Sequence, residues 1–191
     1  MLSDTTHVTA AVSRAADWHK ALSYEAFLPT AVDNVDLWRG VYDRFVPPAD
    51  VVARAAAVPG RWHLLVISED WCGDASNTVP VLARLAEAAP NLDLRLLARD
   101  ENLALMDEHL TGTSRGIPVV LVLDEAFAEH GWWGPRPADL QRWVLAEGLK
   151  IEDHDARYRE VRKWYARDHG QSTMREVLDL LGTVTGGHGV V

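Results

Sequence analysis

Two stretches of the sequence decide the fold: SEDWCGDAS at residues 68–76 and RGIPV at residues 115–119. The first follows the apolar run Trp62–Ile67 and precedes apolar residues at helical spacing, so it predicts a strand, a turn and a helix. The second leads directly into Val119–Leu123, the most strand-like segment of the chain. Cys72 therefore lies at the start of a helix, where free N–H groups and the helix dipole favour a thiolate.

Outward from these stretches, the middle of the chain continues to alternate between strands and helices. Apolar runs predict further strands at Leu92–Leu97 and Phe127–Trp132. Helices are predicted over Thr78–Ala89, Glu101–Leu110 and Pro137–Glu147. The order β-α-β-α-β-β-α predicts an α/β fold, with a mixed β-sheet of four or five strands and helices on both faces.

The segment before the first predicted strand has the pattern of helices. We expect one over about Thr9–Leu22, a second over Val35–Phe45, and a short third that begins at Pro47 and Pro48. Proline suits the first turn of a helix, because the missing N–H would be unpaired there in any case.

The segment after the predicted sheet is also expected to be helical. A helix is predicted over Glu152–His169, with Gly170 as its cap. Thr173 and Glu176 have the spacing of a capping box, which predicts that a last helix starts there and ends at Leu181.

These elements predict a single domain over residues 1–191. The core with the predicted sheet would occupy residues 61–148, after a helical N-terminal extension at residues 1–60. C-terminal helices would follow at 149–182, and a Gly-rich flexible tail at 183–191.

Composition excludes several classes of protein. The net charge is −9, with 28 acidic side chains against 19 basic ones, which opposes binding to nucleic acid or to an anionic membrane. No stretch reaches the roughly 18 apolar residues of a membrane span, and Met1–Thr9 has no signal pattern. A single cysteine excludes an internal disulfide and suits a reducing compartment, so we expect a cytoplasmic protein. No cluster of metal ligands stands out, and we expect neither a metal nor a cofactor.

Three motifs together carry a family resemblance. Trp71-Cys72-Gly73 matches the start of the W-C-G-P-C motif of the thioredoxin superfamily, and Pro80 matches the proline that kinks the following helix. Gly116-Ile117-Pro118 matches the segment that contains the cis-proline of that superfamily. The stretch from Trp62 to about Glu147 thus resembles a thioredoxin, and the whole chain looks like a bacterial branch described only as thioredoxin family proteins. The resemblance implies a thioredoxin-like fold with Cys72 as the nucleophile.

The chain departs from the family pattern at three positions. Ala75 replaces the second cysteine, so no thiol in this chain can resolve a mixed disulfide formed by Cys72. Asp74 replaces the loop proline and places a negative charge beside the sulfur, which disfavours the thiolate. Val66 stands where thioredoxins carry a buried acid. Dithiol disulfide reduction is therefore not expected.

Two functions remain open. In the first, Cys72 performs monothiol thiol–disulfide exchange or redox sensing with a client protein or a low-molecular-weight thiol, and Ser76 donates a hydrogen bond to the sulfur. In the second, the fold is redox-inactive and binds a peptide or protein partner at the cis-proline groove. A pKa of Cys72 at or above roughly 8.5, the value of a free thiol, would exclude the first. The residues expected to bind the substrate or partner are Trp71, Gly73, Asp74, Ala75, Ser76, Ile117 and Pro118.

Overall fold

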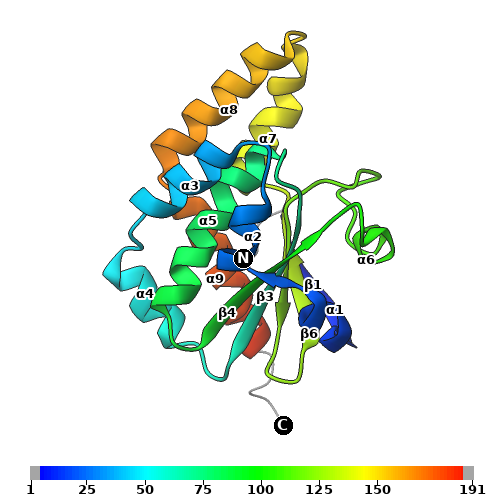
Figure 1. Cartoon of the computed structure of the whole chain (residues 1–191), viewed down its shortest axis with the longest axis vertical. Helices are drawn as coiled ribbons and strands as arrows, with labels where there is room; N and C mark the ends of the chain where they lie inside the picture. The colour runs from blue at the N-terminus through cyan, green and yellow to red at the C-terminus, as the bar shows by residue number, and fades with distance from the viewer. Residues whose placement is uncertain (1–4, 187–191) are drawn as a thin grey trace.

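The computed structural model, which describes residues 5–186, is built around one six-stranded mixed sheet (Figure 1). The strand order is β1-β6-β5-β3-β4-β2. The central neighbours β3 and β4 are parallel, and the other neighbouring strands are antiparallel. The strands are β1 (Thr6–Ser13), β2 (Leu22–Ser23), β3 (Trp62–Ser68), β4 (Leu92–Ala98), β5 (Val119–Leu123) and β6 (Ala128–Trp133).

Helices cover both faces of this sheet. The helices are α1 (Ala15–Lys20), α2 (Tyr24–Phe27), α3 (Val35–Arg44), α4 (Ala49–Ala56), α5 (Gly73–Ala88), α6 (Leu103–Asp107), α7 (Ala138–Ala146), α8 (His154–Asp168) and α9 (Gln171–Gly186). Two short 3₁₀ turns lie at Leu28–Thr30 and Gly148–Lys150.

Two adjacent tryptophans of β6 show which helices lie on which face. Successive residues of a strand point to opposite faces. Trp133 donates from Nε1 to Glu176 of α9 over 2.7 Å, and α9 in turn packs against α5. Trp132 contacts the ring of His109, which follows α6, on the opposite face. The predicted α/β architecture with helices on both faces is therefore confirmed.

The core is deepest at β3 and β5. Every residue of these two strands is buried, which accounts for their continuous apolar sequences, since each strand is covered from both sides. The segment Val119–Leu123 forms a strand over the residues predicted for it. Helices α4 and α7 begin directly after Pro48 and Pro137, as the prolines indicate.

The predicted helix over Thr9–Leu22 is wrong in its first half. The segment Thr6–Ser13 is instead the edge strand β1, antiparallel to β6, and only Ala15–Lys20 is helical. His7 stacks on Trp132 with ring centroids 3.9 Å apart. The free edge of β6 pairs with this segment, and the local sequence pattern cannot show such a pairing. With β1 and β2 the sheet has six strands, more than the predicted four or five.

The predicted capping box is also wrong. Helix α9 begins at Gln171, after His169 and Gly170 in left-handed conformations, so Thr173 lies inside the helix. The Glu176 carboxylate accepts hydrogen bonds from the Ala138 N–H and the Trp133 indole rather than closing a cap. The helix also continues past Leu181 to Gly186. The predicted flexible tail is thus helical at 183–186, and residues 187–191 lie outside the described part.

Helices α7 and α8 form an arm that projects beyond one end of the sheet (Figure 1). The arm lies between Gly134 and Gly170, both of which have positive φ angles. Its small apolar cluster of Leu140, Val161 and Tyr165 is separate from the main core. This arm supplies residues that contact Gly73 and Asp74, the two residues that follow Cys72.

Candidate functional site

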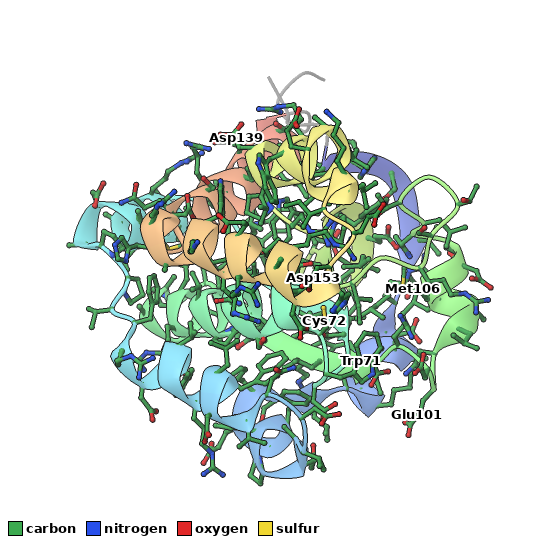
Figure 2. The ribbon with its side chains drawn as sticks, turned by 90° about the horizontal axis from the view of Figure 1, so that it is seen from above. Trp71, Cys72, Glu101, Met106, Asp139 and Asp153 are labelled. Atoms are coloured by element: carbon green, nitrogen blue, oxygen red, sulfur yellow. The ribbon has the colours of Figure 1, made fainter. Side chains whose placement is uncertain are left out.

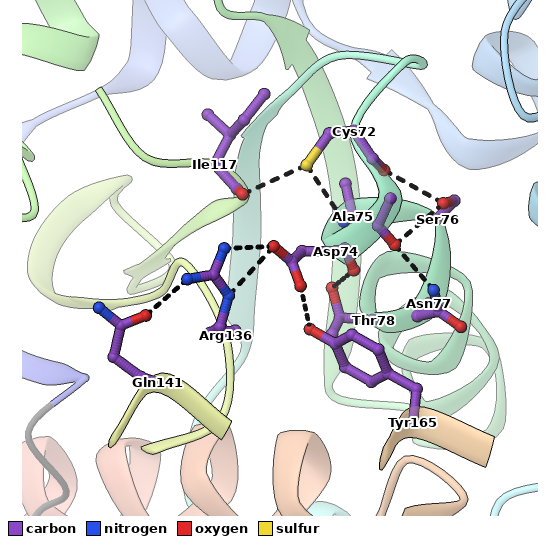
Figure 3. Close-up of polar contacts among 11 residues, drawn as sticks. Cys72, Asp74, Ala75, Ser76, Asn77, Thr78, Ile117, Arg136, Gln141 and Tyr165 are labelled. Carbon is purple, nitrogen blue, oxygen red and sulfur yellow. Dashed lines mark hydrogen bonds and ion pairs between the residues drawn. The ribbon is translucent and has the colours of Figure 1, made fainter. Parts of the chain in front are cut away.

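Cys72 lies at the N-cap of α5 and is 8% exposed. Its sulfur accepts a hydrogen bond from the Ala75 N–H at 3.4 Å, and its thiol donates to the Ile117 carbonyl at 3.3 Å (Figure 3). The second bond requires the proton to be on the sulfur. The geometry therefore favours the neutral thiol over the thiolate, which the carbonyl oxygen would repel.

The loop before Cys72 is held by the N-terminal extension. Asp70 accepts the backbone N–H groups of Val32 and Asp33 on one carboxylate oxygen, at 2.7 and 3.1 Å. The Asp70 carbonyl accepts the indole N–H of the fully buried Trp38 in α3 at 2.9 Å. These bonds give the extension a role in fixing where the cysteine lies.

Asp74 is buried at the start of α5 and is paired with residues of the arm. The Arg136 guanidinium donates to one oxygen from Nε at 3.0 Å and also from Nη2. The Tyr165 hydroxyl of α8 donates to the other oxygen at 2.8 Å, and Gln141 of α7 accepts from Arg136 (Figure 3). The residue that replaces the loop proline thus anchors the arm to the site.

These surroundings raise the pKa of the Cys72 thiol to about 11. Burial is the main cause, because it penalises the charged thiolate, and the negative charge of Asp74 adds to it. The Ala75 N–H and the positive charge of Arg136 act in the opposite direction but are outweighed. The thiolate that the helix start favours in isolation is therefore disfavoured in the folded protein.

Ser76 does not contact the sulfur. Its hydroxyl donates to the backbone carbonyls of Cys72 and Gly73, at 3.1 and 3.2 Å. The prediction that Ser76 donates to the thiol is wrong, because the hydroxyl at this position in the first turn of α5 bonds back to the preceding turn.

Ile117 and Pro118 lie beside the sulfur and are both buried. The peptide bond between them is cis. The Ile117 carbonyl is already occupied by the thiol, and Pro135 closes over Gly116. The structure brings this segment next to Cys72, while its role in binding a substrate stays a prediction.

Trp71 and Gly73 form the outer surface of the site. Trp71 is 46% exposed, and the Arg99 guanidinium lies over its ring at 4.9 Å. Gly73 is covered by Tyr158 of α8, so closely that an added Cβ would lie 3.3 Å from the tyrosine ring. Figure 2 shows the start of α8, marked by Asp153, beside Cys72.

Arg136, Tyr158 and Tyr165 belong to the site and were not predicted from the sequence. They come from the arm, 60 or more residues after Cys72 in the chain. One signal pointed to such a partner: an aspartate at a buried loop position needs a cation. Nothing in the sequence shows which of the later arginines supplies it.

Other kinds of site find no support in residues 5–186. No group of three or more side chains there is arranged to hold a metal ion. None of the helices in the same range combines the length and the apolar character that crossing a membrane requires.

The fold and this site define a thioredoxin-fold protein with one buried cysteine at the start of α5. A thioredoxin family model matches residues 21–159, and the chain belongs to that family. No curated protein matches the chain.

Two solved structures resemble the chain over 90% of its length. One is a protein of unknown function from Pseudomonas aeruginosa, with 22% identity, a TM-score of 0.69 and 98% of its own chain covered. The other is an HIV epitope scaffold, with 21% identity, a TM-score of 0.68 and 99% of its chain covered. At this identity the likeness shows the fold alone.

Proposed function

We propose that this protein is a redox-inactive thioredoxin-fold module that binds a peptide or protein partner without forming a bond to Cys72. The observation that carries the proposal is the hydrogen bond from the buried Cys72 thiol to the Ile117 carbonyl. A carbonyl oxygen beside the sulfur favours the neutral thiol, which is a poor nucleophile because the thiolate is the form that attacks a disulfide.

The pKa of Cys72 supports the same function. With a pKa of about 11, the thiolate at pH 7 amounts to about one molecule in ten thousand. The absence of a second cysteine removes the step that would release a covalent partner. A fold that keeps its loop, its helix start and its cis-proline without an active thiol is suited to non-covalent binding.

The test is the pH dependence of alkylation of Cys72. The folded full-length chain is treated with iodoacetamide between pH 6 and 11, and the adduct is measured by mass spectrometry. We expect slow modification at pH 7 and a rise only at the alkaline end. The same chain in urea should react as a free thiol, with a midpoint near 8.5. A folded-state midpoint below 8.5 would show that the site favours the thiolate and would overturn the proposal.

Monothiol exchange is the second candidate, favoured by the Ala75 N–H that points at the sulfur. In that reaction the Cys72 thiolate attacks a low-molecular-weight disulfide, a mixed disulfide forms on Cys72, and one thiolate leaves. Incubation with glutathione disulfide distinguishes the two functions. A glutathione adduct on the folded chain supports exchange, whereas unmodified protein supports the non-covalent module. Either function suits the cytoplasm, which remains our expectation for a chain with a single thiol.

A further inference from the structure

A groove runs between α3 and α8, above α5. It consists of two cavities of about 390 and 350 Å³ that share three lining residues, Leu37, Asn77 and Arg162. We call it the α3–α8 groove. One end is lined by Trp71 and Gly73, next to Cys72, and the other reaches Gly170 at the end of the arm.

The lining of the groove is largely apolar. Leu37 and Val41 of α3 line it, together with Phe45, which directly follows α3, and Val81 of α5. Leu37, Val41 and Phe45 are only partly buried, so the chain itself does not cover them completely. An apolar surface of this kind gains from a partner that covers it.

Two arginines line the groove without a partner among the residues that the structure describes. Arg44 of α3 and Arg162 of α8 are exposed, and within residues 5–186 neither forms a hydrogen bond or an ion pair. Arg136, by contrast, is paired with Asp74. Among the described residues Arg39, Arg159 and Arg167 also form no hydrogen bond or ion pair, but Arg44 and Arg162 are the two of these arginines that line the groove.

Gly40 in the middle of α3 makes room for Arg44. The Arg44 guanidinium folds back over this glycine, and a Cβ there would lie only 2.8 Å from one of its nitrogens. Glycine inside a helix costs stability relative to alanine. The open space therefore lets Arg44 lie along the groove.

The other charged or titratable side chains of the lining do not neutralise Arg44 and Arg162. Asp155 is the one carboxylate among the lining residues, and it lies beside His154 near the end at Trp71, with 3.6 Å between the carboxylate and the ring. His169 lines the opposite end. The middle of the groove thus offers two guanidiniums above apolar side chains.

We propose that the α3–α8 groove binds an extended acidic peptide segment of a partner protein, with its apolar side chains against α3 and its carboxylates on Arg44 and Arg162. Planar guanidiniums bind carboxylates with two parallel hydrogen bonds, which gives selectivity for acidic over basic sequences. This inference rests on the proposed function, because it names where the non-covalent partner docks and what chemistry it has.

The test is fluorescence anisotropy with a labelled eight-residue peptide of alternating Glu and Leu, against the same peptide with Lys for Glu. The full chain should bind the acidic peptide and not the basic one. A double variant, Arg44→Glu with Arg162→Glu, should weaken binding by about tenfold or more, because each lost pair is replaced by repulsion. Circular dichroism checks that each variant is folded. If the charge reversal perturbs α3, the milder double variant Arg44→Gln with Arg162→Gln replaces it and should show a smaller loss of peptide affinity.

Arg39→Glu with Arg159→Glu is the matched control, since it makes the same charge change on α3 and α8 at exposed positions outside the groove lining. It should change the affinity by less than about twofold. Equal losses in this control and in the Arg44→Glu with Arg162→Glu variant would overturn the proposal and would indicate non-specific electrostatic attraction. Concentration-dependent dimerisation that the groove variants abolish would also overturn it, because the occupant would be a second copy of the chain.

The two proposals fail in different ways. Rapid alkylation of Cys72 at pH 7 would refute the redox-inactive module whatever the groove binds. Slow alkylation together with unchanged peptide binding by the groove variants would refute the groove alone. Cys72→Ser should bind the acidic peptide as the parent chain does.

Discussion

The surroundings of Cys72 and the α3–α8 groove both adjoin the first turns of α5. They differ in whether their charged side chains have partners within the chain. Around Cys72, the Asp74 carboxylate is buried against Arg136 and Tyr165, and every charge has a partner within the chain. In the groove, Arg44 and Arg162 have none within residues 5–186. A charge that is satisfied internally holds the fold together, and a charge left at the surface is available to a partner.

The sharpest test of this difference is Arg136→Ala. The change leaves the Asp74 carboxylate buried without its cation, and we expect a loss of about 3–5 kcal/mol in the free energy of unfolding. Urea denaturation followed by circular dichroism measures it, with Arg136→Lys as the variant that keeps a charge. A loss below about 1 kcal/mol would show that the pair does not anchor the arm.

The second test uses alkaline pH on the Cys72 pocket. Folding raises the pKa of Cys72 from 9.0 to about 11. Between these two pH values the unfolded chain loses the thiol proton while the folded chain keeps it, so ionisation of Cys72 favours unfolding. The stability that comes from the neutral thiol is fully present below pH 9 and is lost as the pH rises through about 11.

The parent chain should therefore lose about 2–3 kcal/mol more than Cys72→Ala across this interval. Unfolding curves of both chains measured from pH 8 to 11 give the difference. The pKa of the buried Tyr165 is raised mainly by burial, which is common to both chains, so most of its contribution cancels in the comparison. If the free energy of unfolding fell equally with pH in both chains, the pKa of Cys72 would be the same in the folded and unfolded states.

A third test is Gly40→Ala in the wall of the groove. The added methyl group favours the helical backbone and should raise the free energy of unfolding by about 0.5–1 kcal/mol. It also displaces the Arg44 guanidinium, a flexible side-chain end, and should weaken acidic-peptide binding severalfold. Thermal unfolding and fluorescence anisotropy measure the two effects. A more stable chain with unchanged peptide affinity would show that Gly40 has no role in binding at the groove.

The smallest expected effect completes the comparison. Arg44→Ala and Arg162→Ala remove the same kind of side chain as Arg136→Ala, but from exposed positions without partners. Each should change the free energy of unfolding by no more than about 0.5 kcal/mol. A loss of several kcal/mol in the same urea assay would reveal a structural role for these arginines and contradict their assignment to binding.

Much of the central fold could be predicted because its elements are locally marked. The buried strands β3 and β5 are continuous apolar runs, and the prolines at 48 and 137 precede two helices. The edge strand β1 could not be predicted in this way. Its segment is a strand only because β6 lies beside it, and a short run with mixed pattern carries no record of that neighbour.

The candidate site also has features that the local sequence predicted and features that it could not predict. Trp71, Cys72 and Gly73 were found as one local motif and Pro118 as part of another, and the structure brings the two motifs together. The ionisation of Cys72 could not be read from that motif, because the start of a helix favours the thiolate while burial and Asp74 disfavour it more strongly.

By itself, then, the sequence determined the thioredoxin-like core, the single cysteine and the absence of a resolving thiol, because all three depend on residues close together in the chain. Only the tertiary structure decided that the arm packs against Gly73, that Arg136 and Tyr165 satisfy Asp74, and that a groove opens between α3 and α8. Burial and charge pairing arise from segments distant in sequence, so they exist only once the chain has folded.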